Sequence, residues 1–503
     1  MTEIGHFING SGNAGNSGRN QAVHNSAIGA SERKVALASV DEVNAAVAAA
    51  QAAFPAWSKT PPLRRARILE KFKNILIDRA GELAATLASE HGKTHENALG
   101  KVTRGLEVVE FAVGAPHLMK GDVFENVGTR VDSTSLRQAL GVVVGITSFN
   151  FPFMELAWMF PIAIACGNTF VLKPSERVPS ASLLIADWLS EAGLPDGVFN
   201  AVNGDKEAVD ALLTHSDVKA ISFVGSTPIA KYIYETGTAN GKRVKALGGA
   251  KNHAIILPDA AINVAVEGLM GAAFGFAGER CMAISVAMPV TDAVAGALIE
   301  KLVPKIKELN IGPTTDQPAE MGPLITAQHL EKVKGYIDKG EAGGGKIVVD
   351  GRTFEQTSQG YENGYFIGGT LIDGVTEDMT VWKEEIFGRV LSIVRRDSFK
   401  EAVDLVHSSP YGNGVAIYTG DGDASRAFAH DIQVGMVGIN VPIPVPMAFH
   451  SSGGWKDSLF GDHHMHGPEG VRFYTKLKPI TTRWPRKSAA TQSSVAMPTL
   501  GCP

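Results

Sequence analysis

Short apolar runs that alternate with amphipathic segments constrain the fold of this chain most strongly. The expected strands are Val142–Ile146, Phe170–Leu172, Val198–Val202 and Ile221–Val224, and the expected helices between them include Ala181–Leu189 and Ile229–Tyr234. Strands that are apolar at nearly every position are typical of parallel sheets that are covered on both faces. The alternation therefore predicts an α/β fold with a parallel sheet and helices on both sides.

A second series of the same kind follows. Its expected strands are Ala254–Leu257, Val286–Val290, Val390–Val394 and Ala416–Tyr418, with a helix over Val264–Phe274. We therefore expect two α/β domains that meet near Leu247–Lys251. Before the first series, Ser39 and Glu42 have the spacing of a capping box at the start of an alanine-rich helix, and Pro61 opens a second helix.

Two further segments fit neither domain. Val123–Leu136 and Val471–Trp484 are β-like and polar at alternate positions, so we expect them to pair with each other or with another subunit. At roughly 100–200 residues per domain, 503 residues accommodate this division. We expect the first domain to comprise residues 1–120 and 138–249 and the second to comprise residues 250–455. The remaining segments, 121–137 and 456–484, would form an arm. We expect 485–503, rich in Ser, Thr, Ala and Pro, to be disordered.

Charge and cysteine content exclude several classes of protein. The net charge is −5 and the chain has no basic block, so we expect no nucleic-acid partner. The three cysteines, Cys166, Cys281 and Cys502, are too few for a disulfide framework or a zinc site. The N-terminus lacks a signal pattern, and polar residues and prolines interrupt the apolar tract Leu140–Leu172. We therefore expect a cytoplasmic protein without membrane segments.

Two motifs resemble ligand sites only weakly. Gly340–Lys346 nearly matches a phosphate-binding loop, but Ile347 follows instead of a hydroxyl residue, which favours a glycine-rich turn. His463, His464 and His466 have only Asp462 as a nearby ligand, so we expect no metal. Cys281 is more informative, because it follows the small-residue stretch Gly271–Ala277, and Arg280 could favour its thiolate. On these residues alone, a nucleophile and a small buried side chain are equally favoured.

Six motifs in register resemble the aldehyde dehydrogenase superfamily over roughly residues 5–480. They are Ser148–Phe153, Lys173–Glu176, Phe223–Ser226, Leu247–Gly249, Cys281 and Glu384–Gly388. The resemblance implies a Rossmann-type NAD-binding domain, an α/β catalytic domain and a small β oligomerisation arm. It makes Cys281 the nucleophile that forms a thiohemiacetal, with the Asn150 side chain and the Cys281 N–H as donors to the oxyanion.

The same resemblance assigns the NAD site. It places Lys173 and Glu176 at the adenosine ribose, and a carboxylate there favours NAD over NADP. It places Gly225 and Ser226 at a helix N-terminus facing the pyrophosphate. The remaining cofactor residues that it implies are Ser148, Phe149, Glu385, which would bind the nicotinamide ribose, and Phe387, which would pack near the nicotinamide ring.

One position departs from the family pattern in an informative way. Hydrolytic members carry a Glu before Leu-Gly-Gly that activates water, whereas this chain has Ala246, and no Asp or Glu lies between Glu235 and Asp259. We therefore expect a thiol acceptor, coenzyme A, to release the acyl group. Further segments are similar to CoA-acylating methylmalonate-semialdehyde dehydrogenases: Arg104–Phe111, Gly249–His253, Glu279–Ala283, Asn440–Phe449 and Gly453–Lys456.

This narrower resemblance implies oxidation of malonate or methylmalonate semialdehyde to acetyl-CoA or propionyl-CoA with loss of CO₂. It nominates Arg104 and Arg280 for the substrate carboxylate, and it implies a homodimer or homotetramer. Two alternatives stay open: a hydrolytic enzyme with Glu279 or Glu385 as base, and a catalytically silent structural relative. Arg389, where Pro is usual, and His450–Ser452 also depart from the pattern, with no role predicted for either.

Overall fold

The computed structural model describes residues 2–313 and 319–484, and its first body is built on an eight-stranded sheet. The strand order is β22-β12-β11-β8-β9-β10-β2-β3. The five central strands β8 to β12 run parallel, and β2 and β22 join the sheet antiparallel. The bounds are β2 His6–Ile8, β3 Ser11–Asn13, β8 Val142–Ile146, β9 Thr169–Lys173, β10 Phe199–Ala201, β11 Val218–Val224, β12 Arg243–Leu247 and β22 Leu459–Phe460.

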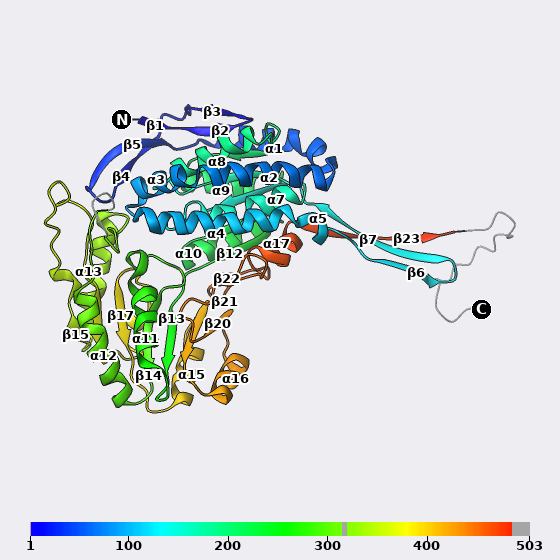
Figure 1. Cartoon of the computed structure of the whole chain (residues 1–503). Helices are drawn as coiled ribbons and strands as arrows, with labels where there is room; N and C mark the ends of the chain where they lie inside the picture. Colours follow the sequence, from blue (N-terminus) through cyan, green and yellow to red (C-terminus); the bar gives the residue numbers. More distant parts are fainter. Residues whose placement is uncertain (1, 314–318, 485–503) are drawn as a thin grey trace.

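Helices cover both faces of this sheet (Figure 1). They are α1 Val40–Lys59, α2 Pro62–Asp78, α3 Ala80–His91, α4 His95–Val113, α5 Ala115–Leu118, α6 Met154–Ala157, α7 Phe160–Ala165, α8 Ser180–Glu191, α9 Lys206–Thr214, α10 Thr227–Ala239 and α17 Gly467–Phe473. The predicted capping box is present, because Ser39 and Glu42 each accept a backbone hydrogen bond from the other. A small sheet of β1 Thr2–Ile4, β5 Ala30–Ala36 and β4 Asn20–Asn25 lies at the N-terminal edge.

The second body has a seven-stranded sheet in the order β15-β16-β17-β14-β13-β19-β20, in which all pairs except β15 with β16 are parallel. The chain passes into it between Leu247, which ends β12, and Asn252, which begins β13. The strands are β13 Asn252–Ile256, β14 Ile284–Pro289, β15 Lys346–Val349, β16 Thr370–Asp373, β17 Val390–Ile393, β19 Gly414–Tyr418 and β20 Met436–Ile439. The helices are α11 Ile262–Leu269, α12 Asp292–Lys307, α13 Ala327–Ala342, α14 Thr380–Lys383, α15 Phe399–Ser408 and α16 Gly422–Asp431, and a short pair joins β18 Tyr411–Gly412 to β21 Trp455–Lys456.

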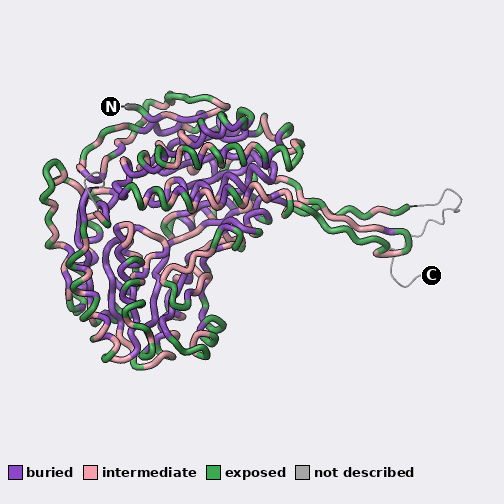
Figure 2. The backbone as a smooth tube through the Cα atoms, in the orientation of Figure 1, coloured by how far each residue is buried: buried purple, intermediate pink, exposed green. Residues whose placement is uncertain are grey.

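The two leftover segments pair with each other. The arm consists of β6 Val123–Gly128, β7 Val131–Ala139 and β23 Thr475–Arg483, and β23 runs antiparallel to β7 over its whole length. It protrudes from the molecule (Figure 1), and most of its surface is open to solvent (Figure 2). The expected range for the arm began too early at residue 456, because β22 completes the first sheet and residues 471–473 belong to α17.

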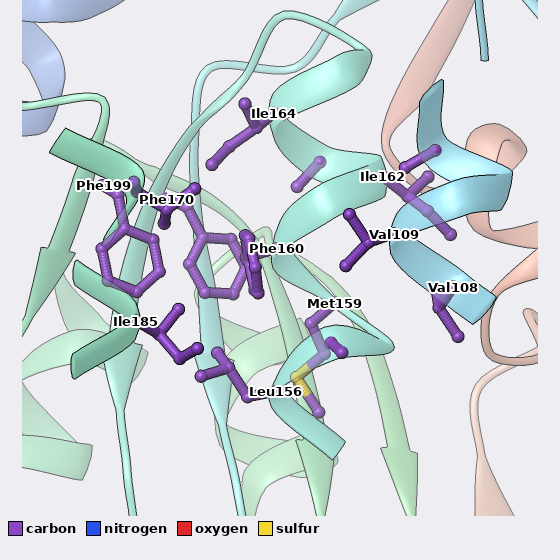
Figure 3. Packing of buried hydrophobic residues seen from close by; sticks show 14 of the residues in the cluster. Val108, Val109, Leu156, Met159, Phe160, Ile162, Ile164, Phe170, Ile185 and Phe199 are labelled. Atoms are coloured by element: carbon purple, nitrogen blue, oxygen red, sulfur yellow. The ribbon is translucent and has the colours of Figure 1, made fainter. Parts of the chain in front are cut away.

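The core explains why the central strands are apolar on both faces. Every residue of β8, β9 and β13 is buried. Under the first sheet, Phe160 is fully buried and packs edge-on against Phe72, Phe170 and Phe199, at ring-centroid distances of 5.7, 6.4 and 5.6 Å (Figure 3). None of the helices within residues 2–313 and 319–484 combines the length and apolar character needed to cross a bilayer.

Removing the central ring of this cluster should destabilise the first body. Phe160→Ala is expected to lower the free energy of unfolding by about 3–5 kcal/mol, because the neighbouring rings cannot collapse into the space that it leaves. Ile77→Ala on α2, where the side chain is about half exposed, should change it by less than about 0.5 kcal/mol. Denaturant unfolding followed by tryptophan fluorescence measures both, and equal effects of the two substitutions would contradict the packing argument.

Candidate active site

Two cavities meet at Cys281. The first has a volume of about 480 Å³ and is lined by Ser148, Phe149, Asn150, Arg177, Val224, Gly225, Ser226, Gly248, Gly249, Cys281, Thr326, Gln328, His329, Lys332, Glu385 and Phe387. The second has a volume of about 300 Å³ and is lined by Lys101, Arg104, Phe151, Met154, Trp158, Val224, Leu247, Gly248, Arg280, Cys281, Met282, Asn413, Met436, Ile443, Val445, Ser452 and Gly453. Cys281 therefore faces two separate spaces, with Val224 and Gly248 also in both walls.

The backbone that leads to Cys281 is unusual. The expected helix over Val264–Phe274 is α-helical only to Leu269 and continues as a π-helical turn over Met270–Phe274. Phe276 and Ala277 then adopt left-handed conformations with φ of 58° and 59°, which cost of order 1–3 kcal/mol each for residues with a Cβ. Strain of this kind, together with a π-helical turn, is common at functional sites.

Two amides fix the nucleophile on the second sheet. The carbonyl of Cys281 accepts hydrogen bonds from Asn252 Nδ2 at 2.8 Å and from Asn413 Nδ2 at 3.1 Å. Asn252 begins β13, and Asn413 immediately precedes β19, its neighbour in the sheet. The position of Cys281 is therefore set by the ends of two adjacent strands.

The thiol of Cys281 is not activated in this state. Burial, together with the nearby Glu155 and Glu385 carboxylates, raises its pKa to about 12. Arg280 and Lys101 act in the opposite direction, as predicted for Arg280, but they do not offset burial. The predicted effect of Arg280 on the thiol is therefore present, but burial outweighs it.

Asn150 lines the first cavity together with Cys281. It is buried, its side-chain oxygen accepts a hydrogen bond from Ser148 Oγ, and its backbone carbonyl accepts one from Lys93 Nζ. The Asn150 side-chain amide nitrogen has no protein partner in residues 2–313 and 319–484, which leaves it available to a ligand. Ser148 is itself anchored, because its backbone N–H donates to Glu155 Oε2 at 3.0 Å.

Gly225 and Ser226, which lead into α10, and the segment around Glu385 also line the first cavity. Ser226 is the N-cap of α10 but makes no side-chain cap hydrogen bond, so the N-terminal N–H groups of this helix can receive an anion. Glu385 Oε1 accepts a hydrogen bond from Ala250 N at 2.9 Å. A Cβ at Gly249 would lie 2.5 Å from Glu385 Oε2, so a side chain there would force this carboxylate to move.

Aromatic and cationic residues complete this cavity. Phe387 adopts φ of 60°, its ring packs edge-on against Phe149 at 6.0 Å, and its carbonyl is 2.7 Å from His329 Nε2. The residue assignments made from sequence missed Arg177, His329 and Lys332. Arg177 directly follows the motif that ends at Glu176, which is the only signal that the sequence offers for it.

Lys173 and Glu176 form an ion pair at 2.8 Å but are not among the residues that line either cavity. Lys173 is buried at the end of β9, and Glu176 is partly exposed. They lie next to Arg177, which is in the cavity wall. The structure thus brings together Ser148, Phe149, Asn150, Gly225, Ser226, Cys281, Glu385 and Phe387 directly, and Lys173 and Glu176 only through a neighbour.

The second cavity is rich in cations. Arg104 on α4 donates to Glu107 at 2.8 Å, an ion pair within the helix, and also to the Pro446 carbonyl at 3.0 Å. The Arg280 guanidinium lies 4.3 Å from the Phe276 ring centroid, and its buried Nε has no partner in the described part of the chain. Lys101, which the sequence did not single out, lies one helical turn before Arg104.

The wall of the second cavity contains no Asp or Glu among the described residues that line it. Burial raises the pKa of Glu279 to about 8, and its Oε1 accepts the Ile325 N–H at 3.0 Å. Glu385 is the one acidic residue in the wall of the first cavity, counting the described residues. Ala246 is fully buried in β12 and lines neither cavity.

The weaker motifs have structural roles. Gly340–Lys346 spans the end of α13 and the start of β15 and lines neither cavity. His463 Nδ1 is 3.0 Å from Glu469, and His466 Nε2 is 3.2 Å from Ser452 Oγ. Across residues 2–313 and 319–484, no cluster of His, Cys, Asp and Glu could hold a metal ion.

Arg389 is buried and donates to the carbonyls of Ile367 and Gly322. Cys502 lies outside the described residues.

Comparison with known proteins agrees with this arrangement. The model of the aldehyde dehydrogenase family matches residues 13–480, so the chain belongs to the aldehyde dehydrogenase family. It is 56% identical to a malonate-semialdehyde dehydrogenase of Pseudomonas aeruginosa, an alignment that covers 99% of this chain and 100% of the relative. It is 50% identical to malonate-semialdehyde dehydrogenase 2 of Geobacillus kaustophilus, over 95% of this chain and 98% of the relative.

Solved structures give the same picture. The methylmalonate-semialdehyde dehydrogenase of Oceanimonas doudoroffii superposes with a TM-score of 0.95 at 57% identity, over 97% of this chain and 99% of that one. A second structure, from Sinorhizobium meliloti 1021, is complexed with NAD, and its own assignment as a methylmalonate-semialdehyde dehydrogenase is provisional. It superposes with a TM-score of 0.96 at 55% identity, over 97% of this chain and 99% of that one. The expected aldehyde dehydrogenase fold is confirmed.

The ionisation of Cys281 can be tested by alkylation. Because burial raises the pKa of this thiol to about 12, the thiolate is the minor form throughout pH 6–10. Iodoacetamide labelling of the unliganded protein should therefore be slow and should accelerate about tenfold per pH unit. Mass spectrometry of the Cys281 peptide follows the reaction, and Cys281→Ser is the control. A plateau below pH 9 would contradict a raised pKa.

Proposed function

We propose that this chain is an NAD-dependent, CoA-acylating dehydrogenase of malonate or methylmalonate semialdehyde. The products are acetyl-CoA or propionyl-CoA, CO₂ and NADH. One observation carries the proposal: Cys281 stands where a cavity suited to a dinucleotide meets a second cavity that is lined by cations and, among its described residues, by no carboxylate. The names of the relatives support the same substrates.

The first cavity fits NAD. The open N-terminus of α10 and the cations Arg177 and Lys332 suit the pyrophosphate, and Glu385 suits the hydroxyls of the nicotinamide ribose. Lys173 and Glu176 would hold the adenosine ribose, where the Glu176 carboxylate disfavours a 2′-phosphate. Ser148, Phe149 and Phe387 would enclose the nicotinamide. The relative from Sinorhizobium meliloti that is complexed with NAD supports this assignment.

Cys281 and Asn150 carry the first chemical step. The sulfur forms a C–S bond to the aldehyde carbon, the thiol gives up its proton, and the carbonyl oxygen becomes an oxyanion. The Asn150 amide and the Cys281 backbone N–H donate to that oxyanion. Bound NAD⁺ supplies the hydride acceptor, and loss of hydride from the adduct carbon leaves a thioester on Cys281.

Arg104 and Arg280 distinguish these substrates from simple aldehydes. A semialdehyde carries a carboxylate, and guanidinium groups bind carboxylates through two parallel hydrogen bonds. Arg104 is held by Glu107 and the Pro446 carbonyl, whereas the unpartnered Nε of Arg280 needs an acceptor. An anionic substrate would satisfy that buried donor, because an unpaired buried polar group is costly.

Release of the acyl group falls to a thiol. Hydrolysis needs a base within reach of the thioester, but Ala246 has no ionisable group and Glu279 is hydrogen-bonded to Ile325 N outside both cavities. Attack by coenzyme A replaces one thioester with another, so this exchange changes the free energy little and needs little driving force. Glu385, in the wall of the first cavity, is the observation that favours the alternative, a hydrolytic aldehyde dehydrogenase.

The arm supports assembly into a homodimer or homotetramer. Val123, Phe124 and Leu477 are each more than half exposed on the arm, and exposed apolar side chains on a protruding sheet favour burial against another subunit. Size-exclusion chromatography with light scattering tests the proposed assembly, which a monomeric mass would contradict.

Dependence on coenzyme A decides between the two fates of the thioester. With malonate semialdehyde and NAD⁺ alone, we expect a single burst of about one NADH per site, followed by turnover at least about 10²-fold slower than with coenzyme A. Stopped-flow absorbance gives the burst, and mass spectrometry of the thioester identifies the product. Rapid steady-state turnover without coenzyme A would establish the hydrolytic alternative, and absence of a burst would indicate a silent relative.

Arg104→Ala tests recognition of the carboxylate. Loss of a charge-assisted hydrogen bond of about 1.5–3 kcal/mol should raise KM for malonate semialdehyde about 10- to 100-fold, while KM for propanal changes less than about threefold. Arg104→Lys is the matched control, since it keeps the charge and should lie between the wild type and the alanine variant. Equal effects on both aldehydes would refute the assignment.

A further inference from the structure

Lys101 is a cation in the second cavity that the steps above do not use. Its ammonium lies 4.2 Å from the ring centroid of Phe276 and 4.7 Å from that of Phe151. Within residues 2–313 and 319–484 it has neither a hydrogen bond nor an ion pair. It shares the cavity wall with Cys281, and the two groups are close enough for each charge to favour the other.

Lys101 differs from its neighbours in what it can do with a proton. The guanidinium groups of Arg104 and Arg280 cannot lose one in a protein. Burial, helped by the charges of Arg280 and Arg104 and opposed by a thiolate at Cys281, lowers the pKa of Lys101 to about 7. Lys93, whose pKa is itself lowered by Lys101, also faces the Phe151 and Phe276 rings. An ammonium in these surroundings readily gives up its proton.

The reaction has a step that needs such a donor, an inference that rests on the proposed function. Once the hydride has left, Cys281 carries a malonyl or methylmalonyl thioester. The bond from the α-carbon to the carboxylate then breaks, CO₂ departs, and the electron pair moves into a thioester enolate. The α-carbon must gain one proton before coenzyme A releases an acetyl or propionyl group.

We propose that Lys101 is the general acid that protonates this carbon. The ammonium gives a proton to the α-carbon, the enolate becomes the acyl thioester, and a neutral amine remains. The thiol proton released when Cys281 adds to the aldehyde restores the ammonium, so oxidation and loss of CO₂ together exchange no net proton with solvent. No carboxylate base is needed for that balance, in agreement with Ala246.

The charges of the reacting group favour this order of events. While the substrate carboxylate is present, it attracts the Lys101 ammonium and keeps it protonated. When CO₂ leaves, that attraction ends beside the newly formed enolate carbon. Among the described residues that line the second cavity, Ser452 is the one with a hydroxyl group, and this hydroxyl lies 3.2 Å from His466 Nε2. A serine hydroxyl is a far weaker acid than a lysine ammonium.

The ratio of two products reports this step. With malonate semialdehyde, NAD⁺ and coenzyme A, slow loss of CO₂ lets coenzyme A intercept the uncleaved thioester as malonyl-CoA instead of acetyl-CoA. We expect acetyl-CoA from the wild type at pH 6.5, and a rising share of malonyl-CoA at higher pH, once Lys101 loses its proton in the acyl-enzyme. Lys101→Met and Lys101→Arg should slow CO₂ loss about 10²-fold and give mainly malonyl-CoA with no such pH dependence.

Controls separate the possible roles of Lys101. An NADH burst with propanal, which has no carboxylate, shows that each variant is folded and binds NAD⁺, and Ser452→Ala should keep the wild-type ratio. If Lys101→Arg also keeps that ratio, Lys101 acts only as a charge and the proposal is overturned. It is overturned as well if Ser452→Ala alone shifts the ratio, or if Lys101→Met loses the burst with malonate semialdehyde but not with propanal. Failure of the wild type to form either CoA thioester would instead contradict the proposed function.

Discussion

The site depends on how the carbonyl of Cys281 is held. Asn252 and Asn413 both donate to it, and both stand at the beginnings of adjacent parallel strands of the second sheet. Parallel strands of one sheet begin at the same edge, so two residues far apart in sequence reach one atom without a long loop. The nucleophile is thereby fixed to the second body, while the Ser148–Asn150 segment and the Gly225–Ser226 turn before α10 line the same cavity from the first body.

Most of the fold could be predicted from the sequence, because buried parallel strands are apolar at most positions. The runs at β8, β9, β13 and β19 were recognisable for this reason. The left-handed Phe276 and Ala277 were not, since neither residue type favours positive φ and tertiary contacts impose it. Residues 471–473 resembled a strand because an alternating pattern in a short segment does not exclude one helical turn.

The residues of the candidate site could be predicted where they belong to a sequence motif. They could not be predicted where only the packing of the fold brings them into the site. Asn150, Glu385 and Cys281 lie in recognisable motifs and share one cavity. Lys101 lies on an ordinary amphipathic helix, where a lysine most often faces solvent, and only the packing of α4 turns it inward. The ionisation of Cys281 was also beyond the sequence, because the adjacent Arg280 is visible there but the burial that outweighs it is not.

The end of the chain returns to the first body after the second sheet is complete. Phe460 and Leu459 in β22 pair with β12, and Ser458 both accepts from Gly248 N and donates to the Gly249 carbonyl. Those two glycines are walls of the site. During synthesis, a ribosome must therefore release the chain through Phe460 before this wall can close. A chain truncated ahead of Ser458 would keep Cys281 and the other strands of both main sheets. It would lack β22 and the hydrogen bonds of Ser458 that hold Gly248 and Gly249 in the cavity wall.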